Sequence, residues 1–187
     1  IGGESTRPGS ATVAEKDEIA RVVPVIEAIR AAGITTPISI DTRKASVAAA
    51  ALDAGADIVN DVAAMTYDSA MAGLVAERGV PVCLMHAQGD PATMQDDPRY
   101  DDVVLDVFDW LSERISAAQS AGIARDKIIV DPGIGFGKTL QHNVSLLQNL
   151  SIYHDLGFPI LLGASRKRFI GTIGNALHAG AFKAVLC

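Results

Sequence analysis

Five short apolar runs, rich in β-branched residues, alternate along the chain with longer segments of helical periodicity. Each run is nearly continuous in apolar character, which is typical of parallel strands covered on both faces. The alternation continues without a low-complexity linker, so the pattern predicts one α/β domain of βα units over residues 1–187. The predicted strands are residues 36–42, 57–62, 79–86, 127–133 and 158–165.

Four segments have the spacing of amphipathic helices. Thr12 and Glu15 are placed as a capping box, and apolar residues follow them at helical intervals as far as Ile29. Pro24 interrupts this pattern and predicts a kink or a late start, because proline removes a backbone hydrogen bond. The other predicted helices are residues 44–54, a longest helix from 103 to shortly before Gly122, and residues 143–153.

Every apolar run ends in a polar residue. Barrel enzymes draw their functional groups from the C-terminal ends of several strands, whereas an open sheet concentrates them at one switch point. The distribution over five runs therefore favours a (β/α)8 TIM barrel. The strand-end residues are Asp41, Asn60 with Asp61, His86, Asp131 and Ser165.

The length predicts a partial barrel. A complete barrel typically needs about 250 residues, and the chain has 187. It begins at Ile1, and "GGESTRPG" follows as if a strand were already under way. We therefore expect a barrel truncated at both ends, from about the end of strand 2 through strand 7 to the start of helix 7.

The glycine-rich stretch 128–143 has a superficial likeness to a phosphate-binding loop. Pro132 stands where a Walker A loop needs its first glycine, and Lys138 stands at the third glycine position of a dinucleotide fingerprint. Both phosphate-binding interpretations fail. What remains is a turn that brings Asp131, Phe136 and Lys138 together at a strand end.

Charge and composition exclude several classes of function. The net charge of −6 has no basic cluster to offset it, which argues against nucleic-acid or anionic-membrane binding. No apolar stretch approaches the roughly 20 residues of a membrane span, and no signal-peptide pattern is present, so a cytoplasmic protein is expected. Cys83 and Cys187 do not form a disulfide framework, and Cys83 is expected in the core. His86 alone is a weak candidate for a metal ligand or a base.

Asp41, Asn60 and Asp131 are expected to converge at the mouth of the barrel. Two carboxylates and an amide suit a planar heterocycle with a donor edge, such as a 2-amino-4-oxopyrimidine ring. Simpler roles exist, since Asp41 precedes a helix that it would cap and Asp131 precedes a Pro-Gly turn. Lys167 would extend to solvent and Met85 would pack in the core. None of these roles explains a polar residue at every strand end.

Six motifs, in this order and at these spacings, make the chain resemble the bacterial dihydropteroate synthase family up to about Gly171. The resemblance implies a (β/α)8 barrel that joins 4-aminobenzoate to 7,8-dihydropterin-6-ylmethyl diphosphate in folate biosynthesis and releases diphosphate. The segment after Gly171 fits the family poorly. The motifs are "GGESTRPG", "SIDTRK", "IVNDV", "CLMHAQGDPATMQ", "VDPGIGFGK" and "GASRKRFIG".

The resemblance also implies the site residues. Asp41, Asp131 and Lys167 would be the catalytic groups, with the carboxylates favouring a pterin cation that forms when magnesium-bound diphosphate leaves. Lys138 would lie outside the reacting centre. The implied pterin pocket is Asp41, Asn60, Met85, Asp131, Gly163 and Lys167. The implied 4-aminobenzoate site is Thr6, Arg7, Pro8, Phe136, Lys167 and Arg168.

The implied cofactor is Mg²⁺, bound with the substrate diphosphate. The family's metal-binding asparagine would precede residue 1 and its last-strand Arg-x-His motif would follow the matched region, so no metal ligand is expected in this chain. The full-length protein would be a homodimer and a target of sulfonamides, which compete with 4-aminobenzoate. The 187 residues alone are expected to be inactive and poorly folded, with strand edges that invite aggregation.

Two other functions fit part of the pattern. A barrel that transfers a methyl group from methyltetrahydrofolate to a corrinoid protein would share the Asp/Asn/Asp pocket, but it has no need of "GGESTRPG" or "SRKR". A non-catalytic pterin-binding paralogue would keep the same pocket residues, and only an activity assay or the missing strands would separate it from the enzyme.

Overall fold

The computed structural model describes residues 1–7, 9–89, 93–165 and 167–173. Within these ranges, four strands form a parallel sheet in the order β1-β2-β3-β4. The strands are β1 (Ser39–Asp41), β2 (Ile58–Asp61), β3 (Val82–Met85) and β4 (Ile128–Asp131). Single bridges continue the parallel pairing beyond each edge strand, from Gly2 to Asp41 and from Val130 to Ile160.

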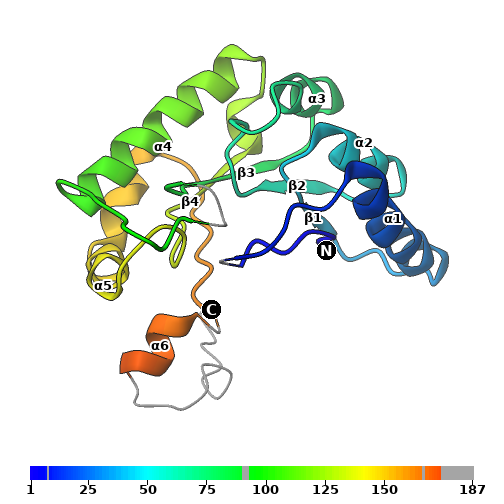
Figure 1. Ribbon diagram of the computed structural model, residues 1–187. Coiled ribbons are helices and arrows are strands. Elements are labelled where there is room, and N and C mark those ends of the chain that lie inside the picture. The colour runs from blue at the N-terminus through cyan, green and yellow to red at the C-terminus, as the bar shows by residue number, and fades with distance from the viewer. Residues whose placement is uncertain (8, 90–92, 166, 174–187) are drawn as a thin grey trace.

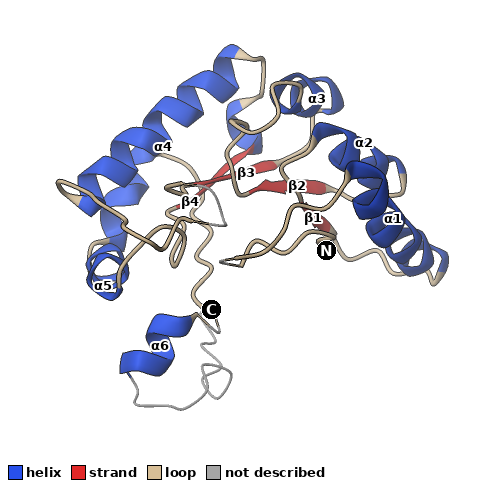
Figure 2. Cartoon of the chain, in the orientation of Figure 1, coloured by secondary structure: helices blue, strands red, loops and turns tan. Residues whose placement is uncertain are grey.

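The helices follow an arc around one side of the sheet (Figure 1). Figure 2 shows that each strand leads into a helix of this outer layer, which is the arrangement of a (β/α)8 barrel that is open on one side. A final helix, α6 (Arg168–Ile173), lies apart from the arc. The arc contains α1 (Glu15–Ala31), α2 (Ala45–Asp53), α3 (Met71–Arg78), α4 (Val103–Ser120) and α5 (Leu140–Gln148), with 3-10 helices at Arg125–Lys127 and Leu150–Leu156.

Strand register divides the side chains of the sheet between two faces. One face packs against the helices and is fully buried, and it includes Ile40, Val59, Leu84 and Val130. On the other face, Asp41 is paired with Asn60 and Asn60 with Cys83. Because paired residues of a parallel sheet point to the same side, the predicted site residues share the face turned away from the helices.

Helix α4 makes the longest helical contact with the core and confirms the predicted apolar stripe. Val107 and Leu111 are fully buried, whereas Leu105 is 50% exposed. Asp102 caps the helix, since its Oδ1 accepts hydrogen bonds from Val104 N at 2.9 Å and Leu105 N at 3.2 Å. Cys83 is also buried, as predicted.

The start of the first helix differs from the prediction. Ala14 is the N-cap of α1 and no side chain caps it, so the predicted capping box of Thr12 and Glu15 is wrong. Thr12 instead lies 3.5 Å from Arg43 Nη2, and Glu15 accepts a hydrogen bond from Ser46 Oγ at 2.7 Å. The helix runs through Pro24, which is exposed, so the predicted late start is wrong.

The last predicted helix and strand also differ from the structure. Helix α5 begins three residues early because Thr139 and His142 form a capping box, in which His142 takes the place usually held by Glu or Gln. The apolar run 158–165 contributes only the bridge at Ile160 rather than a strand. Its backbone still pairs with β4, since Leu161 N donates to Val130 O at 2.8 Å.

We expect Leu111→Ala to lower the free energy of unfolding by about 2–5 kcal/mol, because it leaves a cavity between α4 and the sheet. Leu105→Ala on the exposed face of the same helix should change it by less than about 0.5 kcal/mol. Urea denaturation followed by circular dichroism measures both. Equal losses in the two variants would contradict the packing of α4 described here.

Candidate functional site

Asp41 and Asn60 lie side by side at the ends of β1 and β2. The Oδ1 atom of Asp41 is buried and has no hydrogen-bond partner among the described residues. Burial raises the pKa of Asp41, and the N-terminal ammonium, Asn60 and Lys167 only partly oppose this effect. A buried acceptor without a donor is costly, so this atom is placed to receive a donor from a ligand.

Asp131 ends β4 beside Met85 at the end of β3. Its Oδ1 accepts a hydrogen bond from Gly133 N at 2.7 Å. Burial raises the pKa of Asp131 to about 6, although this hydrogen bond and the two ammonium groups of Lys167 and Lys138 act in the opposite direction. A Cβ atom on Gly163 would lie 3.8 Å from Oδ2 of Asp131, so the absence of a side chain keeps the space beside the carboxylate open.

Lys167 connects the two carboxylates to an aromatic ring. Its Nζ lies 4.0 Å from the centre of the Phe136 ring, within the range of a cation–π contact. Burial lowers the pKa of Lys167, while the charges of Asp131 and Asp41 act to raise it. The Lys167 ammonium therefore interacts both with the charges of Asp41 and Asp131 and with the Phe136 ring.

A cavity of about 870 Å³ lies next to this ammonium. Thr6, Arg7, Phe136 and Lys167 line it, so four members of the implied 4-aminobenzoate site are brought together. Pro8 and the side chain of Arg168 lie outside the described residues. The implied pterin residues Asp41, Asn60 and Asp131 are not in this lining and face the open side of the sheet instead.

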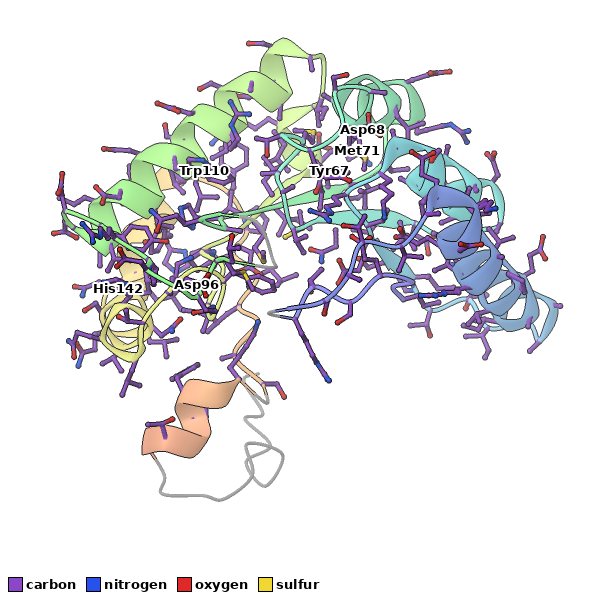
Figure 3. All side chains as sticks on the ribbon, viewed as in Figure 1. Tyr67, Asp68, Met71, Asp96, Trp110 and His142 are labelled. Carbon is purple, nitrogen blue, oxygen red and sulfur yellow. The ribbon has the colours of Figure 1, made fainter. Side chains whose placement is uncertain are left out.

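A smaller cavity of about 250 Å³ adjoins it, and Phe136 and Met94 line both. Tyr67 and Trp110 form part of the wall of the smaller cavity (Figure 3). The guanidinium carbon of Arg43 lies 4.1 Å above the Tyr67 ring. Phe136 and Met94 therefore belong to the walls of both spaces.

The loop that carries Thr6 and Arg7 is anchored by buried charges that we did not predict. Lys44 Nζ donates to Glu18 Oε2 at 2.5 Å and to Glu4 Oε2 at 2.7 Å, and Arg43 Nε donates to Glu4 Oε1 at 3.0 Å. Glu4 Oε2 also accepts from Val13 N at 2.7 Å. One carboxylate thus holds both ends of the loop, and the four side chains together carry no net charge.

The pKa shifts in this cluster favour the charged forms. Burial acts to raise the pKa of Glu4, but Lys44, Val13 N–H and Arg43 outweigh it and lower the value. Burial acts to lower the pKa of Lys44, but Glu18 and Glu4 outweigh it and raise the value. Glu4 and Lys44 are therefore ionised at neutral pH. Sequence patterns gave no signal for Glu18, which looks like an ordinary polar position of the first helix.

The structure brings Lys138 closer to the site than expected. Its side chain is buried and lines the larger cavity. His86 is also buried, and its ring meets Trp110 edge to face at a centroid distance of 4.9 Å. No group of three His, Cys, Asp or Glu side chains in the described ranges is arranged to hold a metal ion. No helix in the described part of the chain is long and apolar enough to cross a membrane.

The sequence matches the family described as "Pterin binding enzyme" over residues 1–184. The chain belongs to this family. Among its curated relatives, dihydropteroate synthase of Escherichia coli (strain K12) is 47% identical over 175 residues, which are 94% of this chain and 61% of that protein. Dihydropteroate synthase of Streptococcus pyogenes is 50% identical over 184 residues, 98% of this chain and 65% of that protein.

Solved structures of pterin-binding enzymes have the same fold. The Yersinia pestis dihydropteroate synthase with a sulfonamide drug has a TM-score of 0.90 at 43% identity, covering 96% of this chain and 64% of that one. The Xanthomonas albilineans dihydropteroate synthase with 4-aminobenzoic acid has a TM-score of 0.90 at 45% identity, covering 97% and 63%. The resemblance and the TIM-barrel fold class are confirmed, and the chain spans about three fifths of the length of the E. coli relative.

We expect Lys44→Met to lower the free energy of unfolding by about 3–5 kcal/mol, because it removes the counter-charge of the buried Glu18 carboxylate and leaves Glu4 with Arg43 alone. The double variant Lys44→Met/Glu18→Gln should lose less, since it removes one of those carboxylates as well. Lys16→Met, on the exposed side of α1, is the control. A double variant that is less stable than Lys44→Met alone would contradict the proposed charge balance.

A second expectation concerns pH. Because burial raises the pKa of Asp131 in the folded protein to about 6 from its ordinary value of 3.8, the folded state binds more protons between these values, so stability falls as pH rises from about 4 to about 6. Asp131→Asn should reduce this slope, with exposed Asp126→Asn as the control. Urea denaturation at several pH values measures the slope. An unchanged slope in Asp131→Asn would show that Asp131 titrates normally.

Proposed function

We propose that this chain forms the substrate-binding part of a dihydropteroate synthase. The reaction joins 4-aminobenzoate to 7,8-dihydropterin-6-ylmethyl diphosphate, gives dihydropteroate and diphosphate, and serves folate biosynthesis. The observation that carries the proposal is the buried, unpartnered Oδ1 of Asp41 on the same face of the sheet as Asn60 and Asp131. Support also comes from the relatives, one of which has a structure in complex with 7,8-dihydropteroate.

In this proposal the pterin lies against the open face of the sheet. The amino and ring N–H groups of the pterin donate to Asp131 and Asp41. The Asn60 amide, which both donates and accepts, pairs with the edge of the ring that carries both a donor and an acceptor. Met85 and Gly163 border the same space, with Met85 buried at the end of β3. With a pKa of about 6, Asp131 is mostly ionised at neutral pH and is available as an acceptor.

The 4-aminobenzoate site is the larger cavity. Phe136 offers an aromatic surface to the benzoate ring, and Lys167, Thr6 and Arg7 offer donors to its carboxylate. Pro8 and Arg168 remain members of this site by resemblance alone. Lys167 lies between the two sites, since it faces Phe136 and interacts with both carboxylates.

The chemistry that this arrangement favours is loss of diphosphate before attack by the amine. The methylene carbon to oxygen bond breaks with its electron pair leaving on diphosphate, and the carbon becomes cationic in conjugation with the pterin. The charges of Asp41 and Asp131 favour that cation. The amine nitrogen then forms the new bond and releases a proton. The implied Mg²⁺ would be bound with the substrate diphosphate, where it would favour departure of that group.

Three further properties belong to the same proposal. Sulfonamides would compete for the 4-aminobenzoate site, in keeping with the drug complex of the Y. pestis relative. The complete protein would be a homodimer and would act in the cytoplasm. Both follow from the family resemblance, and the absence of a basic cluster agrees with small molecules as its partners.

Calorimetry with a 2-amino-4-oxopteridine tests the pocket. We expect Asp131→Asn to weaken binding about tenfold to a hundredfold, because hydrogen bonds to a charged group contribute about 1.5–3 kcal/mol. Asp126→Asn should bind like the unchanged protein. Unchanged affinity in Asp131→Asn would remove Asp131 from the proposed pocket. Pterin binding without dihydropteroate formation by the complete protein would instead favour the non-catalytic alternative.

A further inference from the structure

Lys138 is the residue of the glycine turn that the substrate sites leave without a role. Its side chain is 3% exposed, and its ammonium has acceptors on two neighbouring strand-end loops. Nζ lies 2.9 Å from His86 Nδ1 and 3.4 Å from His86 O, at the end of β3. It also donates to Phe136 O at 3.0 Å, in the turn after β4. Lys138 therefore cross-links the two loops next to the larger cavity. Burial lowers the pKa of Lys138 to about 7, so both the ammonium and the amine are present at neutral pH, and each can donate to the two carbonyl oxygens.

Two glycines of the turn bring backbone against backbone. A Cβ on Gly133 would lie 1.7 Å from His86 O, and a Cβ on Gly137 would lie 2.4 Å from Gln88 O. Both residues also have a positive φ, at +69° and +59°, which favours glycine. The buried side chain of Ile134 and the hydrogen bond from Gly135 N to Asn143 Oδ1 at 2.7 Å also hold the turn, and hydrogen bonds to its carbonyl groups add to these restraints.

Those carbonyl groups are held from different directions. Gln95 Nε2 donates to Gly135 O at 2.7 Å and Tyr100 Oη donates to Gly137 O at 2.8 Å. Both donors belong to the loop between β3 and α4, whereas Phe136 O, between those two carbonyls, meets the ammonium of Lys138. The hydrogen bond from Lys138 Nζ thus restrains the backbone of Phe136, a residue that lines both cavities.

His86 is a rigid acceptor for this ammonium. Accepting at Nδ1 requires the neutral ring with its proton on Nε2. Burial lowers the pKa of His86 to about 2, and the charge of Lys138 acts in the same direction, so the ring stays neutral. Trp110 packs against the ring, and His86 N donates to Asp131 O at 2.9 Å. His86 therefore limits the movement of Lys138, because Trp110 holds the His86 ring and Asp131 holds its backbone.

We propose that Lys138 is a positioning residue for 4-aminobenzoate: it acts through Phe136 and His86, and not on a reacting atom. This inference rests on the proposed function. Phe136 carries the aromatic wall of the 4-aminobenzoate cavity and lies under Lys167, so a displaced Phe136 backbone alters ring packing there. The pterin contacts of Asp41 and Asn60 come from other strands and do not depend on this tether.

Steady-state kinetics of the complete enzyme with Lys138→Met test the inference. We expect KM for 4-aminobenzoate to rise about tenfold, the effect of losing one hydrogen bond. KM for the pterin diphosphate should rise less than KM for 4-aminobenzoate, because Lys138 acts on the pterin residue Asp131 through its charge alone. Lys16→Met, far from the site, is the control and should leave both KM values unchanged. Tyr100→Phe removes a hydrogen bond from the same turn without touching Phe136 O, so its effect on KM should be smaller.

A double variant tests the route through His86. In His86→Leu/Lys138→Met, KM for 4-aminobenzoate should be no higher than in Lys138→Met, because His86 has no tethering role once the ammonium is gone. Additive increases would overturn the part assigned to His86.

Other outcomes separate the inference from the proposed function. A Lys138→Met enzyme with a lower unfolding midpoint and unchanged KM values would show a purely structural lysine and overturn the inference. If Lys138→Met does not fold, Lys138→Gln, whose side chain is one atom shorter and uncharged, takes its place, and an unchanged KM for 4-aminobenzoate in Lys138→Gln would overturn the inference. An unmodified complete protein without synthase activity would count against the proposed function instead.

Discussion

Parallel register between neighbouring strands is the constraint on which the rest of this structure depends. Asp41 lies opposite Asn60, and Met85 lies opposite Asp131, so polar groups from separate βα units share one face at one end of the sheet. A shift of one residue in any strand would turn its polar group towards the helices. The buried packing of Ile40, Leu84 and Val130 against those helices prevents such a shift. Core packing thus fixes the positions of the polar groups on the face that we propose binds the pterin.

Two buried lysines hold two loops beside that face of the sheet. Lys44 binds the segment that carries Thr6 and Arg7, and Lys138 binds the glycine turn that carries Phe136. Both ammonium groups are nearly closed off from water, which is tolerated because each meets several acceptors. Lys138, which follows β4, therefore restrains the segment with Phe136, and Lys44, which follows β1, restrains the segment with Thr6 and Arg7.

Much of the binding face was predictable from sequence, because it depends on local order. Apolar runs that end in Asp41, Asn60 and Asp131 specify both the strands and the side chains at their ends. Features that depend on distant partners were not predictable. Thr12 has the spacing of a cap, yet it faces Arg43, and Glu18 looks like a surface residue until Lys44 is placed beside it. No residue spacing reveals that Lys138 meets His86, 52 positions earlier.

The double role of Glu4 has a consequence for binding thermodynamics. Its carboxylate contacts Val13, nine positions away, so the loop between them is closed at its base. The entropy lost in closing that loop is spent during folding and not each time a ligand binds. Thr6 and Arg7 consequently remain at a high effective concentration beside the cavity.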